Sequence, residues 1–202
     1  MNPLHPSVAP NRAALVAACL LVALPAWAHE GGGQAAGFLS GILHPVSGLD
    51  HVLAMVAVGL WGAQLGAPAI WLLPVAFPLV MAFGGFLGLM GVPLPGVEIG
   101  IALSAVLLGV MVATQSKPPL GAAVALVGFF AVFHGHAHGT ELPEGASGLL
   151  YSVGFVIATG LLHATGIAVG LVHRWERGRL ALRGAGAAVA AAGVFFAWRA
   201  VA

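Results

Sequence analysis

The sequence predicts an all-α membrane protein, with a cleavable signal peptide followed by a bundle of about six transmembrane helices. Only 6% of the 202 residues are charged and the mean hydropathy is +1.02, whereas soluble domains carry roughly 25% charged residues. Six long apolar stretches follow the leader, each close to the roughly 20 residues that a spanning helix needs. So few charges cannot build a surface that faces water, so most of the chain needs lipid as its solvent.

The first 28 residues have the parts of a signal peptide. These parts are a positive residue, an apolar core, a helix breaker and an A-x-A cleavage site: Arg12, Ala13–Leu24, Pro25 and Ala26-Trp27-Ala28. Two alternatives stay open, a lipoprotein signal ending before Cys19 and an uncleaved anchor. Cys19 is the single cysteine, so a chain cleaved after Ala28 has none. Any metal site must then use nitrogen and oxygen ligands.

The apolar stretches are continuous rather than alternating, which favours helices over the strands of a barrel. Turn or charge signals separate them. The predicted spans are Leu43–Trp61, Ala69–Met90, Val97–Ala113, Leu120–His138, Leu149–Val172 and Leu180–Trp198. The organisation is therefore a signal peptide at 1–28, an extracytoplasmic N-terminal segment at 29–42, and a six-span transmembrane domain at 43–202.

The basic residues predict the orientation, because they accumulate on the cytoplasmic side. Lys117 follows the third span, and a group of arginines follows the fifth: Arg174, Arg177, Arg179 and Arg183. The opposite side has only Arg199, near the chain end. Cleavage of the leader leaves the mature N-terminus outside, and six spans return the C-terminus to that side. We expect a multi-pass protein of the bacterial inner (cell) membrane with both termini extracytoplasmic.

Ionisable residues are costly inside a membrane, and here they cluster. The first cluster is the segment HPVSGLDH, from His44 to His51, at the outer end of the first span. In a regular helix these histidines share a face but lie about 10 Å apart along the axis, too far for one ion. Pro45 disfavours helix at His44 and Gly48 permits irregular backbone. A loosened turn would bring the histidines together; otherwise they serve successive sites. Asp50 adds a negative charge beside His51.

The second cluster is FHGHAHGTE, at the outer end of the fourth span. His134 and His138 are four residues apart and meet on one helix face, in an arrangement that commonly binds a metal through both imidazoles. Glu141 continues that face by one turn. His136 points to the other side, toward a different helix or water. Both clusters lie at the same depth, in the outer half of the membrane.

Other polar residues allow two interpretations each. His163, alone in the fifth span, either hydrogen-bonds a neighbouring helix or relays an ion inward. Glu98 either neutralises a helix N-terminus or lines the entrance. Cleavage after Ala28 makes His29 the first residue, whose amine and imidazole can chelate a metal on a flexible glycine-rich arm; a chance residue at this position is the alternative. His173, beside Arg174, is interpreted as interfacial.

The two clusters carry a resemblance to a known family. HPVSGLDH matches the HPxxGxDH motif of the HupE/UreJ nickel/cobalt permeases, and FHGHAHGTE resembles their second motif, FHGxAHGxE. The leader, the size and the six spans also look like this family, so the resemblance covers essentially the whole chain. It implies secondary transport of divalent nickel or cobalt for metalloenzyme or cofactor assembly. It also implies a set of metal-pathway residues: His44, Asp50, His51, His134, His138 and Glu141.

On this interpretation the protein is not an enzyme and has no cofactor, because Ni²⁺ or Co²⁺ is its transported substrate. Its partners are the ion and the lipid bilayer. The sequence has no Walker A motif, so no nucleotide is expected, and a formal net charge of +1 gives no reason to expect nucleic acid. Two alternatives stay open: an intramembrane metal-dependent hydrolase or oxygenase with His134 and His138 on zinc or iron, and a bis-histidine haem protein.

Overall fold

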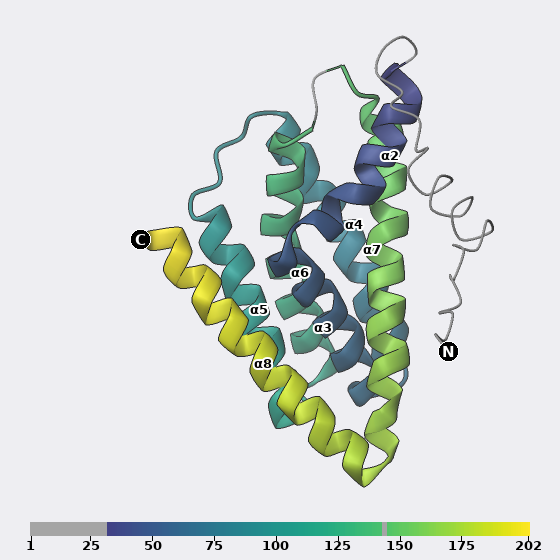
Figure 1. Ribbon diagram of the computed structural model, residues 1–202, viewed down its shortest axis with the longest axis vertical. Coiled ribbons are helices and arrows are strands. Elements are labelled where there is room, and N and C mark those ends of the chain that lie inside the picture. Colours follow the sequence, from purple (N-terminus) through teal and green to yellow (C-terminus); the bar gives the residue numbers. More distant parts are fainter. Residues whose placement is uncertain (1–31, 143–144) are drawn as a thin grey trace, which may run out of the picture. The chain divides into compact units, whose positions relative to one another are not determined.

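The computed structural model describes residues 32–142 and 145–202, so the predicted signal peptide and His29 lie outside the described residues. Within them every regular element is a helix, as predicted (Figure 1). The helices are α2 (Gly32–Ser47), α3 (Leu49–Leu65), α4 (Ala69–Leu89), α5 (Val97–Thr114), α6 (Leu120–Thr140), α7 (Gly148–Gly170), the short 3-10 helix η1 (Leu171–Arg174) and α8 (Glu176–Val201). Five are long and apolar enough to cross a membrane, or six when the bent pair α2–α3 counts as one span.

The first span differs from a straight helix, because α2 and α3 meet at 81°. The sequence predicts that Pro45 interrupts the helix at His44. The prediction is wrong, because Pro45 lies inside α2. The break comes at Gly48, whose backbone is extended (φ −101°, ψ 117°). A Cβ on Gly48 would come within 2.8 Å of the Asp50 carboxylate, so a larger residue here would displace the Asp50 side chain. Ser47 Oγ caps the end of α2 by donating to the His44 carbonyl at 2.6 Å.

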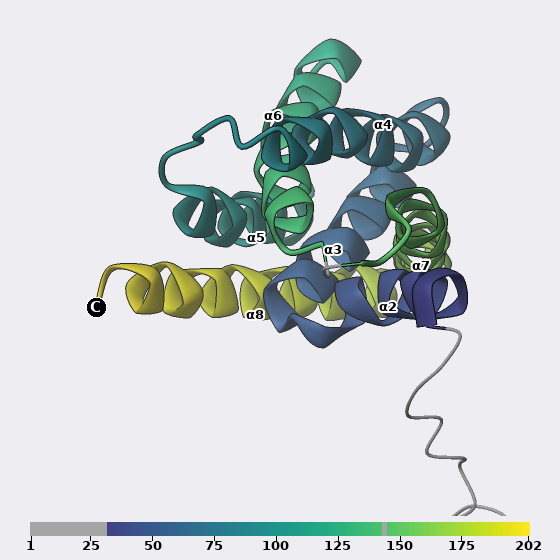
Figure 2. The ribbon, with the colours of Figure 1, turned by 90° about the horizontal axis from the view of Figure 1, so that it is seen from above.

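Helix α3 is the centre of the bundle. It packs against α4, α5, α7 and α8, and Figure 2 shows it between these helices. Near its end, Trp61 Nε1 donates to the Ser116 carbonyl at 3.0 Å, and Gln64 Nε2 donates to the Val112 carbonyl at 3.2 Å. These bonds tie the end of α3 to the end of α5. The start of α3 lies at the opposite end of the bundle, where His51 contacts His134 and His138 of α6.

Helices α4 and α6 pack through glycines. A Cβ on Gly135 would overlap the Met81 carbonyl, and one on Gly139 would overlap the Gly85 carbonyl. Small residues allow such close backbone contact in membrane bundles. The glycines of the second motif therefore form the closest backbone contacts with α4.

The two ends of the bundle differ in charge. Lys117 and Arg174 lie at one end, here called the basic end, and the His44–His51 and His134–Glu141 segments lie toward the other, the histidine end (Figure 1). Three arginines that we expected between spans, Arg177, Arg179 and Arg183, lie instead in the first turns of α8. Their long side chains reach water from a helix end, so the charge does not need a loop.

Candidate metal-ion site

Three side chains at the histidine end could hold one metal ion. His44 of α2, His138 of α6 and Glu141, the residue that ends α6, place ligand atoms within 4.8 Å of one another. His44 Nε2 donates to Glu141 Oε2 at 2.9 Å. The rings of His44 and His138 lie 4.8 Å apart, centre to centre. Two imidazoles and a carboxylate form a ligand set that divalent transition metals accept.

His51 extends this group toward the bundle core. Its ring centre lies 4.5 Å from that of His138 and 4.7 Å from that of His134. His44 and His51 therefore both contact His138, although a straight helix would hold them about 10 Å apart along its axis. The bend at Gly48 makes this possible. This bend is the loosened turn that the sequence allows near Gly48, and it brings the two histidines together.

Hydrogen bonds fix which nitrogen of His51 is free. Asp50 Oδ1 accepts from the backbone N–H of His51 at 2.8 Å and from its ring Nδ1 at 3.0 Å. With the proton on Nδ1, the buried Nε2 carries a lone pair and has no hydrogen-bond partner among the described residues. A carboxylate that orients a histidine in this way is a common second partner of metal ligands. Asp50 is thus a positioning residue for His51.

A serine does the same for His134. The Ser104 hydroxyl donates to the Ile101 carbonyl at 2.6 Å, so its oxygen accepts from His134 Nε2 at 2.8 Å. The buried Nδ1 of His134 then carries the lone pair and has no partner in the described part of the chain. Both ring nitrogens of His138 are also buried without a partner there. Buried polar atoms left unpaired cost about 1–3 kcal/mol each, and a bound cation would offset that cost.

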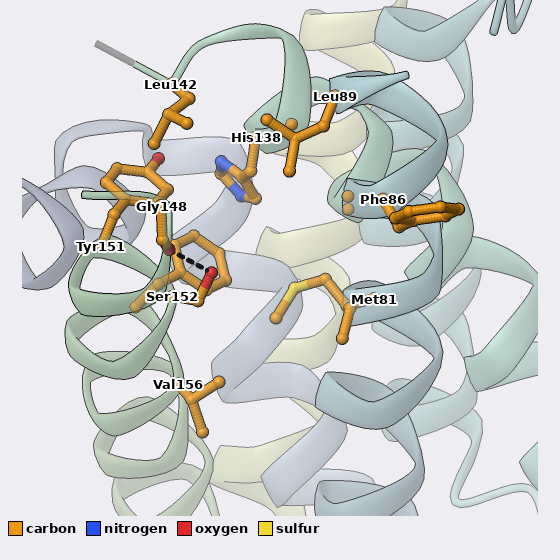
Figure 3. A pocket seen from close by; sticks show the side chains of 14 residues that line it. Met81, Phe86, Leu89, His138, Leu142, Gly148, Tyr151, Ser152 and Val156 are labelled. Carbon is orange, nitrogen blue, oxygen red and sulfur yellow. Dashed lines mark hydrogen bonds between the residues drawn. The ribbon is translucent and has the colours of Figure 1, made fainter. Parts of the chain in front are cut away.

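Two cavities meet at His138. A polar one of about 220 Å³ is lined by five ionisable residues of the two motifs and by Glu98: His44, Asp50, His51, Glu98, His138 and Glu141. An apolar one of about 150 Å³ lies between α4, α6 and α7 (Figure 3), where Met81, Leu89 and Tyr151 surround the His138 ring. The apolar cavity offers a cation few ligands besides His138. A cation bound at this end would therefore find its ligands on the polar side.

The comparisons with known proteins agree with the motifs. A family model described as HupE / UreJ protein matches residues 17–196, which include both histidine segments. The chain belongs to the HupE/UreJ family. It is 49% identical to Protein HupE of Rhizobium leguminosarum bv. viciae over 173 residues, which are 85% of this chain and 91% of that protein. No solved structure matches the chain. HupE/UreJ is a family of nickel/cobalt transporters, so the resemblance and the membrane transport class are confirmed.

Two residues that the sequence associated with metal lie apart from the cluster in this HupE/UreJ protein. His136 points away, as expected, and its Nε2 donates to the Val92 carbonyl at 2.7 Å. His163 lies on α7 and contacts Phe77 rather than the other histidines. His29 lies outside the described residues, and Gly32 and Gly33, which we assigned to a flexible arm, begin helix α2 instead. Glu98 lies in the first turn of α5 and lines the polar cavity, so both of its predicted roles are compatible with its position.

Sequence reasoning missed two residues of the HupE/UreJ site. Ser104 is a lone hydroxyl within an apolar helix, and its pairing with His134 depends on how α5 packs against α6. Tyr151 lies beside His44, with ring centres 5.7 Å apart, and its hydroxyl is buried without a partner in the described residues. Because helix packing decides which side chains meet, neither carried a spacing signal. A buried polar side chain in an apolar span was the one available clue.

The role assigned to Asp50 gives a prediction for this HupE/UreJ protein. Asp50→Ala removes the acceptor that fixes the His51 ring, and we expect the affinity for Ni²⁺ to fall by about 10- to 100-fold, as for other outer-shell partners. Asp50→Asn keeps an acceptor oxygen, so its loss should be smaller. Equilibrium titration of the purified protein with Ni²⁺ measures both. Equal affinities for the wild type and Asp50→Ala would contradict the positioning role.

Proposed function

We propose that this protein is a secondary permease that takes up divalent nickel or cobalt ions for metalloenzyme or cofactor assembly. The observation that carries the proposal is the convergence of unpaired imidazole nitrogens beside carboxylates in one polar cavity, at the end of a membrane bundle. The family supports transport, and the site supplies a place for the cargo. Family membership does not favour the alternative of an intramembrane hydrolase or oxygenase.

The orientation follows from charge. Basic residues accumulate on the cytoplasmic side, so the basic end with Lys117 and Arg174 faces the cytoplasm and the histidine end faces outward. Both chain ends of the mature protein are then extracytoplasmic, in the inner membrane. The polar cavity opens on the side from which a scarce metal arrives.

The ion enters along carboxylates and then exchanges water for imidazole. Glu98 and Glu141, both exposed residues of the polar cavity, attract the cation. His44 and His138 replace part of its water shell, and His51 contacts both His138 and His134 deeper in the bundle. The charge of Asp50 offsets part of the ion's charge in a medium of low dielectric constant. Since the sequence has no nucleotide motif, the ion gradient, the membrane potential or a metal sink drives the movement.

The test is uptake of labelled nickel and cobalt by cells that express this chain, compared with His134→Ala and Asp50→Ala at equal membrane abundance. His173→Ala is the matched control, because that histidine lies at the basic end and, among the described residues, its ring bonds only the Gly170 carbonyl. We expect the wild type and the control to accumulate metal and the two site variants to accumulate little. A wild type that accumulates neither metal under metal limitation would overturn the proposal.

A further inference from the structure

His163 is a buried histidine outside the cluster at the histidine end. It lies on α7, is 1% exposed, and neither ring nitrogen has a hydrogen-bond partner among the described residues. Leaving such a group unpaired costs about 1–3 kcal/mol, whereas an apolar side chain of similar shape avoids that cost. A histidine buried at this position therefore needs a polar partner.

One aromatic ring separates His163 from the cluster. Phe77 of α4 has its ring centre 5.4 Å from that of His134 and 5.6 Å from that of His163. Its side chain is fully buried. A phenyl ring in contact with both histidines offers a cation no nitrogen or oxygen ligand.

Unused donor atoms gather behind this ring. Pro78 has no N–H, so the carbonyl of Pro74, four residues earlier in α4, loses its helical partner. This carbonyl lies within hydrogen-bonding reach of the His163 ring. Thr159 lies one turn before His163 on the same face of α7. It is fully buried, and its hydroxyl also has no partner within the described part. Nitrogen and oxygen donors of this kind suit divalent transition metals.

We propose that His163, Thr159 and the Pro74 carbonyl form a second, inner station for the transported divalent cation, and that Phe77 closes the passage from the outer cluster. The inference rests on the proposed permease function. Pro74 and Pro78 flank Phe77, and each removes one helical hydrogen bond from α4. Helices bend at such positions. Bending of α4 there moves the ring aside and lets the ion advance by one station.

The first test replaces His163 with leucine. His163→Leu removes both unpaired nitrogens, so we expect unchanged or higher thermal stability in detergent. Ni²⁺ affinity at the outer cluster should stay unchanged, whereas uptake into proteoliposomes should fall by about tenfold or more, as for loss of a metal-site group. Phe77→Leu, which removes the ring, should keep the outer affinity and raise the uptake rate.

The second test detects the inner station without transport. In His138→Ala protein, which lacks a ligand of the outer cluster, we expect weaker Co²⁺ binding to remain visible in the visible-range absorption of the metal. Adding His163→Leu should abolish that residual signal. Adding Leu162→Ala, at the neighbouring position of α7, should preserve it.

The outcomes separate this inference from the permease function. A wild type that transports metal together with a His163→Leu variant that transports equally would overturn the inner station alone. Loss of outer-cluster affinity in His163→Leu would also overturn it, because the residue would then shape the cluster. An uptake rate unchanged in Phe77→Leu would remove the barrier role of the ring. A wild type that neither binds nor transports metal defeats the proposed function first.

Discussion

Replacing His138 with alanine is expected to have the largest effect of any single change on metal binding and uptake. His138 is the residue that contacts both His44 and His51, and it lies in the group with Glu141 that could hold one ion. Both of its nitrogens are buried without a partner in the described residues. Even outer-shell partners are worth about 10- to 100-fold in affinity, so loss of this ligand should lower Ni²⁺ affinity by about 100-fold or more.

His136→Ala is the matched control for this prediction. It is the same substitution, two residues earlier on α6, but its ring turns to the Val92 carbonyl instead of the cluster. We expect His136→Ala to keep outer-site affinity within a factor of a few of the wild type. Equilibrium titration with Ni²⁺ and uptake at equal membrane abundance measure both variants. Equal losses in the two variants would show that α6 has been disturbed as a whole, and would contradict a ligand role specific to His138.

The second large effect is on folding, at Gly135. A methyl group there would overlap the Met81 carbonyl of α4. Backbone atoms cannot move aside as a flexible side chain can, so Gly135→Ala must push α4 and α6 apart. Overpacking costs about 1–3 kcal/mol and sometimes more. We expect Gly135→Ala to lower the thermal stability of the purified protein strongly and to displace His134 and His138 with the helix.

Gly128→Ala provides the comparison on the same helix. A Cβ at Gly128 meets only a Val80 methyl carbon at 3.6 Å, which is ordinary contact. Alanine also forms helix better than glycine, by about 1 kcal/mol, so this variant should be as stable as the wild type or more stable. Thermal unfolding in detergent, measured as the loss of monodisperse protein, ranks the stabilities of the wild type, Gly135→Ala and Gly128→Ala. If Gly135→Ala proved as stable as Gly128→Ala, close α4–α6 contact would not be required.

The sequence alone predicted the helical class, the number of spans and the ends at which the histidines lie. These properties depend on local composition, because lipid demands long apolar segments and their breaks follow proline, glycine and charge. The same reasoning from local composition was wrong for three arginines, which it placed in a loop between spans. Arg177, Arg179 and Arg183 lie in the first turns of α8, because a helix end gives their long side chains the same access to water as a loop.

Which histidines meet was decided by the tertiary structure. Spacing paired His134 with His138 on one helix, but the structure places His51 of α3 in contact with both rings and groups His138 with His44 and Glu141. The sequence shows the residues of both motifs and indicates that the backbone can bend between His44 and His51. The angle of that bend at Gly48, the Ser104 bond and the Phe77 ring between two histidines were not. Each depends on contacts between helices distant in sequence, and such contacts are set by packing of the whole bundle rather than by local periodicity.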